Sequence, residues 1–167
     1  MVVQIKSVGV VGAGQMGGGI AHVCAMAGYD VHVHDVSSER LQTMQATISG
    51  NLARQVSSGK ATDAERDQAL SRIKLAEDMS ALAGMDMVIE AATEDETVKR
   101  KIFQQLCPIL NPEAILATNT SSLSITRLAA ATDRAERFIG IHFMNPVPVM
   151  KLVELVRGIA TEDATFQ

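Results

Sequence analysis

The sequence has few cysteine and aromatic residues and no long segment of one charge or of apolar residues. Its two cysteines, Cys24 and Cys107, lie far apart and form no CxxC or other metal-binding spacing, so we predict no metal site and a reduced setting. The net charge of -4 with scattered basic residues disfavours nucleic acid as a partner. No apolar run reaches membrane-spanning length and no leader pattern precedes the first apolar segment, so we expect a cytoplasmic protein without membrane contact.

Short apolar runs instead alternate with longer amphipathic stretches along the chain. This alternation is typical of strand and helix units that build a mainly parallel sheet with helices on both faces, so the predicted class is α/β. The 167 residues and 47% hydrophobic content fit one domain over residues 1–167. We predict strands over residues 5–11, 31–34, 73–75, 87–89, 114–117, 138–142 and 152–156, and helices over 16–27, 39–58, 62–70, 96–106 and 125–130.

A glycine-rich segment, Gly12 to Gly17, separates the first predicted strand from the first predicted helix. In this pattern Gly12 permits a tight turn, Gly14 lets the backbone approach a pyrophosphate, and Gly17 lets the helix pack on the strand. The alternative is a turn whose glycines only relieve backbone strain. The position at a strand-to-helix junction favours the first interpretation and predicts a Rossmann-type, doubly wound domain.

Asp35 ends the second predicted strand, 23 residues beyond the first glycine of the turn. A carboxylate there accepts hydrogen bonds from a ribose 2′-hydroxyl and repels a 2′-phosphate, so we predict NAD rather than NADP as the cofactor. The alternative is a solvated residue at a strand end.

Polar residues follow several of the predicted strands at their carboxyl ends. Residues 91–94 follow one strand, residues 119–122 follow the next, and His142 ends a third. Because ligands of open parallel sheets bind at this edge, these positions should converge on one crevice. The segment 118–122 has hydroxyl and amide groups suited to positioning a ligand, although Ser122 or Ser124 could instead cap the following helix.

His142 and Glu154 form a predicted pair on neighbouring strands. A carboxylate that holds one imidazole nitrogen fixes the tautomer and stabilises the cation formed when the other nitrogen takes a proton. Glu154 lies in an apolar segment, where an acidic residue is costly unless it is paired. The alternative for His142 is a buried histidine with a structural hydrogen bond. His32 and His34 share a strand face but lack a third metal ligand.

Four segments together resemble a known family: Gly12 to Ala21, Ile89 to Lys99, Ala117 to Ser122 and His142 to Pro148. They are similar to the NAD-binding domain of L-3-hydroxyacyl-CoA dehydrogenases, and most similar to the 3-hydroxybutyryl-CoA dehydrogenase branch. The resemblance implies NAD-dependent oxidation of a 3-hydroxyacyl-CoA to a 3-oxoacyl-CoA, or the reverse, as in the β-oxidation of fatty acids.

The resemblance also implies roles for individual residues. His142 would take the proton of the 3-hydroxyl, Glu154 would orient His142, and Ser121 would hydrogen-bond the substrate oxygen. Lys60 would lie near the phosphates of CoA. Besides the glycines and Asp35, the residues that would contact NAD are Gln15, Met16, Glu94, Lys99, Asn119 and Asn145.

Family members continue into a second, mainly helical domain, which this chain lacks. That domain builds a homodimer interface and closes over acyl-CoA, so the resemblance implies that the chain is a fragment able to bind NAD but poorly active. The last residues, 161–167, are typical of the start of a further helix. Two other functions stay open at this point: an NAD-dependent dehydrogenase of a free hydroxy or sugar acid, and a dinucleotide-binding module without catalysis.

Overall fold

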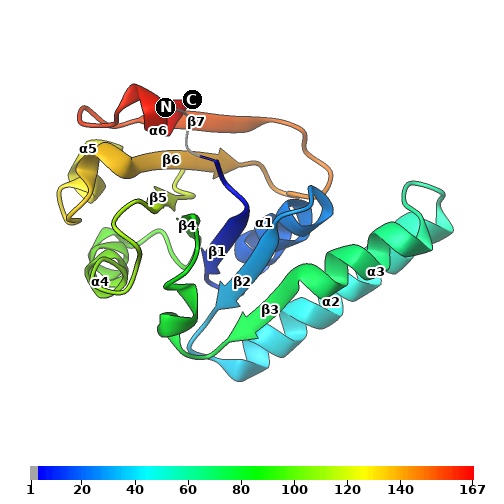
Figure 1. Cartoon of the computed structure of the whole chain (residues 1–167). Helices are drawn as coiled ribbons and strands as arrows, with labels where there is room; N and C mark the ends of the chain where they lie inside the picture. Colours follow the sequence, from blue (N-terminus) through cyan, green and yellow to red (C-terminus); the bar gives the residue numbers. More distant parts are fainter. Residues whose placement is uncertain (1–3) are drawn as a thin grey trace.

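The computed structural model describes residues 4–167 and contains a seven-stranded sheet in the order β3-β2-β1-β4-β5-β6-β7 (Figure 1). All neighbouring strands are parallel except β7, which runs antiparallel to β6. The predicted α/β class is confirmed, with each predicted strand present within two residues. The strands are β1 (Ser7–Val11), β2 (Asp30–His34), β3 (Ile73–Ala76), β4 (Met87–Glu90), β5 (Ile115–Thr118), β6 (Phe138–Phe143) and β7 (Val153–Arg157).

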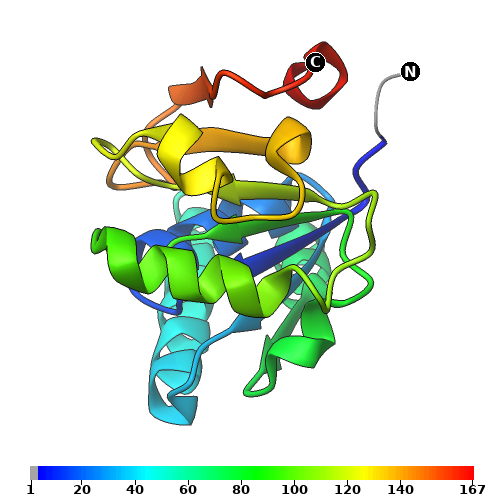
Figure 2. The same cartoon turned by 90° about the vertical axis from the view of Figure 1, so that its left-hand side faces the viewer.

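Helices cover both faces of the sheet, as the two perpendicular views show (Figures 1 and 2). One face carries α1 (Gln15–Met26), α2 (Ser38–Ser57) and α3 (Asp63–Arg72), and the other carries α4 (Glu96–Leu106) and α5 (Ile125–Ala129). The short elements η1 (Met79–Leu82), η2 (Ala135–Arg137) and α6 (Asp163–Phe166) complete the chain. In the described part of the chain, no helix combines the length and apolar character needed to cross a membrane.

Local sequence explains where the helices begin and end. The Ser37 side chain accepts a hydrogen bond from the Arg40 backbone N–H and so caps α2, and Thr62 forms a capping box with Glu65 at the start of α3. Ser124, one of the two predicted caps, begins α5. Helix α2 ends before Gly59, whose φ of 72° suits glycine.

The core has two layers, one on each side of the central strands. Val10 and Val33 contact the layer under α1 and α2, while Phe103 and Phe138 meet edge to face in the layer under α4 and α5. Central strands buried on both faces need continuous apolar runs, which is why these strands were visible in the sequence. The core thus fixes which strand ends meet at one edge.

That edge contains the point where the strand order reverses. The chain runs outward from β1 through β2 and β3, then returns to β4 on the other side of β1. Backbone hydrogen bonds tie the loops together there, from Gly12 N to His34 O and from Ala91 N to Val11 O. A crevice at such a switch point is where open α/β sheets bind ligands.

Candidate active site

The glycine turn between β1 and α1 has a geometry that side chains could not share. Gly12 has a φ of 106°, and a Cβ there would lie 2.6 Å from the carbonyl oxygen of Ala91. A Cβ on Gly17 would lie 1.8 Å from the carbonyl oxygen of Gly12. Gly14, by contrast, has no atom within 4 Å of such a Cβ, so its backbone faces open space.

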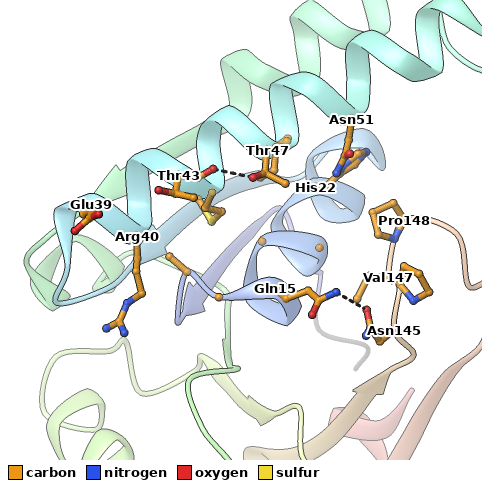
Figure 3. A pocket seen from close by; sticks show the side chains of 17 residues that line it. Gln15, His22, Glu39, Arg40, Thr43, Thr47, Asn51, Asn145, Val147 and Pro148 are labelled. Atoms are coloured by element: carbon orange, nitrogen blue, oxygen red, sulfur yellow. Dashed lines mark hydrogen bonds between the residues drawn. The ribbon is translucent and has the colours of Figure 1, made fainter.

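Two cavities meet at this turn. The first, of about 630 Å³, lies between α1, α2 and the loop of residues 145–148 (Figure 3). The second, of about 460 Å³, lies over the carboxyl ends of β4, β5 and β6. Gly14, Gln15 and Asn145 line both, and the Gln15 amide donates to the Asn145 oxygen at 3.2 Å between them. We call them the helix cavity and the strand-end cavity.

The strand-end cavity collects most of the residues predicted to form the site. They come from four separate segments of the sequence. Those that line it are Gly14, Gln15, Met16, Glu94, Asn119, Ser121, His142 and Asn145.

His142 and Glu154 lie opposite each other on β6 and β7. The antiparallel register pairs them directly, and His142 Nδ1 is 2.8 Å from Glu154 Oε2. Because an ionised carboxylate only accepts hydrogen bonds, this contact places the proton on Nδ1 and leaves Nε2 as the acceptor. The expected burial of Glu154, from which the pairing was argued, was wrong, however. All of β7 is exposed, and the Glu154 side chain is 51% exposed rather than buried in an apolar strand.

Glu94 holds the segment that carries Ser121. Its Oε1 accepts hydrogen bonds from the hydroxyl of Thr120 at 2.6 Å and from the backbone N–H and hydroxyl of Ser121 at 2.9 and 3.3 Å. Partial burial acts to raise the pKa of Glu94, but these hydrogen bonds and the nearby Lys99 ammonium together hold it below its ordinary value. Glu94 is therefore an ionised group that positions Ser121 at the cavity wall.

Lys99 does not line the strand-end cavity, contrary to its expected contact with NAD. Its side chain is fully buried, with Nζ 2.5 Å from Glu90 Oε2 and 3.6 Å from Glu94 Oε2. Thr118 completes the cluster by donating to Glu90 Oε2 at 2.8 Å. The reason is that α4 packs on β4 and β5 and directs Lys99 beneath the strand ends.

Asp35 is not a solvated strand-end residue. Its Oδ2 accepts from the Ala13 backbone N–H at 2.9 Å, which joins the end of β2 to the glycine turn. Its Oδ1 accepts from Ser37 N and from the guanidinium of Arg40. Burial acts to raise the pKa of Asp35, but these hydrogen bonds and the charge of Arg40 outweigh it and lower that pKa.

Asn119 links two strand ends, because its Oδ1 accepts from the Phe143 backbone N–H at 2.8 Å.

Lys60 lies outside both cavities. It occupies the turn between α2 and α3, at the end of that helical hairpin farthest from the sheet (Figure 1).

The ion-pair and hydrogen-bond partners of three residues near the site were not found by sequence reasoning. Glu90 and Thr118 end their strands as buried polar residues, and their side chains bond to each other and to Lys99, which follows Glu90 by nine residues on another element. Arg40 lies five residues after Asp35 at the start of α2, a spacing that could have signalled an ion pair.

The described residues include no group of three or more potential metal ligands.

The residues present fit a dinucleotide. The first turn of α1 carries no acidic residue and no side-chain cap, and Gly14 and Gln15 at its start line both cavities. Free N–H groups at a helix N-terminus favour a pyrophosphate, and the open space at Gly14 lets a ligand approach the backbone.

We expect alanine substitutions at Gly14 and Gly17 to have different effects. Gly14→Ala should weaken NAD binding, and Gly17→Ala should destabilise the fold. Gly14→Ala meets no atom and has an ordinary φ of -75°, so its free energy of unfolding should change by under about 1 kcal/mol while NAD affinity falls at least about tenfold. In Gly17→Ala the new Cβ overlaps the Gly12 carbonyl, so the free energy of unfolding should fall by about 1–3 kcal/mol. Urea denaturation and NAD titration by calorimetry measure both quantities; equal destabilisation by the two variants would contradict this division.

A doubly wound sheet with a glycine turn at its switch point and an acidic residue ending β2 defines a Rossmann-type dinucleotide-binding domain. Comparison with known families is consistent with this class: the sequence model described as "3-hydroxyacyl-CoA dehydrogenase, NAD binding domain" matches residues 7–167. The chain belongs to this family, and NAD is its cofactor, as predicted from Asp35 and the glycine turn.

Relatives of this chain include named dehydrogenases. A 3-hydroxybutyryl-CoA dehydrogenase of Bradyrhizobium diazoefficiens is 66% identical over the whole chain, which spans 57% of that relative. The 3-hydroxyadipyl-CoA dehydrogenase of Escherichia coli is 45% identical over 96% of the chain and 34% of its own length. The crystal structure of (S)-3-hydroxybutyryl-CoA dehydrogenase from Ralstonia eutropha matches with a TM-score of 0.95 at 50% identity, covering 98% of this chain and 58% of the other.

Proposed function

We propose that this chain is the NAD-binding part of a dehydrogenase that interconverts L-3-hydroxyacyl-CoA, in particular 3-hydroxybutyryl-CoA, and the 3-oxoacyl-CoA. The observation that carries the proposal is the His142 and Glu154 pair, because His142 lines the same cavity as Ser121 and the glycine turn. The names of the relatives supply the substrate class.

In the oxidative direction His142 takes the proton of the substrate hydroxyl at Nε2. Glu154 accepts from Nδ1–H and stabilises the positive charge that the ring acquires. In the reductive direction the same imidazolium returns the proton to the carbonyl oxygen. The partial exposure of both side chains lets the proton exchange with solvent between turnovers.

Ser121 is proposed to donate its hydroxyl hydrogen to the reacting oxygen. Its contact with Glu94 Oε1 is long at 3.3 Å, whereas its backbone N–H holds Glu94 at 2.9 Å. The hydroxyl can therefore turn to the substrate while the backbone bond keeps the residue in place. A bound NAD would supply the hydride acceptor, and Gln15, Met16, Asn119 and Asn145, which line the same cavity as His142, are proposed to hold its nicotinamide end.

The rest of the substrate site is proposed to come from a further segment of a longer protein, which would also make a homodimer. The chain spans about half the length of the relatives it matches. Its β7 surface exposes several large apolar side chains: Val149, Met150, Leu152, Val153, Leu155, Val156 and Ile159. Exposed apolar side chains on this edge strand, next to the proposed catalytic pair, favour a further protein surface packed over it. The contact of Lys60 with CoA phosphates stays a prediction.

Activity measurements on the longer protein test this function. With NADH as reductant, we expect turnover of acetoacetyl-CoA and at least about a hundredfold lower kcat/KM for free 3-oxo acids and sugar acids, since they lack the CoA moiety. The 167-residue chain alone should bind NADH yet reduce acetoacetyl-CoA far more slowly, because substrate positioning and water exclusion are incomplete. Preference for a free acid would refute the CoA substrate, and equal turnover by the chain alone would refute the need for a further segment.

A further inference from the structure

Arg40 has no part in the proposed chemistry, yet its guanidinium lies against the residue expected to read the cofactor ribose. Its Nε and Nη2 donate to Asp35 Oδ1 at 3.0 and 2.8 Å. The two partners differ in exposure: the Asp35 side chain is 8% exposed and held by two backbone donors, and the Arg40 side chain is 58% exposed. The arginine can therefore leave this pair, while the carboxylate is fixed.

The carboxylate of Asp35 is already crowded with donors from this chain. Oδ1 accepts from Ser37 N as well as from Arg40, and Oδ2 accepts from Ala13 N. A carboxylate offers about four lone-pair positions. Ribose hydroxyls that hydrogen-bond Asp35 must therefore compete with Arg40, since the two backbone donors belong to the turns that shape the site.

A phosphate on the ribose 2′-oxygen would meet the opposite chemistry. Asp35 would repel it, whereas an arginine close to the end of β2 is the group that accommodates a 2′-phosphate in NADP-binding domains. The fork of a guanidinium suits phosphate oxygens. Arg40 lines the helix cavity, and Figure 3 shows its side chain leaving α2 in a different direction from that of Glu39.

We propose that Arg40 is a latent binding group for the 2′-phosphate of NADP, kept out of use by its ion pair with Asp35. Asp35 then sets the preference for NAD in two ways. Its charge repels the 2′-phosphate, and its ion pair engages the Arg40 guanidinium that would otherwise bind that phosphate. This inference rests on the NAD-binding domain and not on the proposed substrate, because its consequence is a difference in dinucleotide affinity.

A double-mutant cycle on this chain tests the proposal, with NAD⁺ and NADP⁺ titrated by calorimetry. Arg40→Gln alone should change NADP⁺ affinity by less than about threefold, because the ion pair already occupies the arginine, and should leave NAD⁺ binding at least as tight. Asp35→Asn keeps an acceptor oxygen for one of the two backbone donors, removes the negative charge and should raise NADP⁺ affinity about tenfold or more. The double variant should lose that gain.

The control is Arg54→Gln, which removes an arginine from the last turn of the same helix. Combined with Asp35→Asn, it should keep the full gain in NADP⁺ affinity. Asp35→Ser serves in the same cycle if circular dichroism shows that Asp35→Asn is unfolded. An NADP⁺ gain that persists without Arg40, or a tenfold loss of NAD⁺ affinity in Arg40→Gln, would overturn the proposal, since Arg40 would then be unnecessary or would be an NAD contact.

Discussion

Lys99→Met is expected to lower the free energy of unfolding by about 3–5 kcal/mol. The substitution fills the space of the lysine stem but removes the ammonium that lies 2.5 Å from Glu90 Oε2. Among the described residues, Glu90 would then keep a fully buried carboxylate supported by Thr118 Oγ1 and the Ala92 backbone N–H. Urea denaturation followed by circular dichroism measures the loss.

The partner variant separates the ion pair from the packing of the lysine stem. Glu90→Gln added to Lys99→Met removes the uncompensated charge and should recover part of the stability, so the two effects should not add. Lys101→Met changes an exposed lysine of the same helix and should stay within about 0.5 kcal/mol of the original protein. Additive effects of the Lys99 and Glu90 substitutions would show that the buried pair is not coupled.

His142→Asn in the longer protein should lower kcat for 3-hydroxybutyryl-CoA oxidation by about 100- to 10,000-fold, the usual contribution of general base catalysis. Asparagine cannot take the substrate proton, although it keeps a polar group at the end of β6. NAD affinity should change little, because the glycine turn and Asp35 are untouched. Stopped-flow measurement of NADH formation and calorimetric titration of NAD determine the two quantities.

Glu154→Gln measures how much the carboxylate of Glu154 contributes to catalysis by His142. The glutamine oxygen can still accept from Nδ1–H, but it cannot neutralise the imidazolium, so the loss in kcat should be smaller than for His142→Asn. If His142→Ala left both activity and binding unchanged, the domain would be a dinucleotide-binding module without a catalytic role for this pair.

The fold and most of the site were predictable because their signals are local. Buried parallel strands must be apolar, helix ends need caps such as Ser37, and the glycine turn needs residues without a Cβ. The carboxyl ends of parallel strands share one edge, so placing residues such as Ser121 and Asn119 after strands was enough to predict that they converge.

Other features depend on contacts that sequence spacing does not reveal. Lys99 was expected at the cavity and lies beneath it, because helix packing decides whether a lysine reaches solvent or a buried carboxylate. Glu154 was paired correctly for the wrong reason, since burial at an edge strand depends on what covers that strand. Arg40 was overlooked because the side-chain direction at the start of α2 determines its contact with Asp35.

By itself, then, the sequence determined the α/β class, the dinucleotide turn and the set of residues that meet at one sheet edge. Those properties follow from backbone conformation and hydrophobic periodicity, which each segment carries in its own residues. Only the tertiary structure decided which charges are paired and which face the cavities. Ion pairs such as Lys99 with Glu90 and Arg40 with Asp35 arise where packed elements bring side chains within a few ångströms, and that geometry belongs to the whole domain.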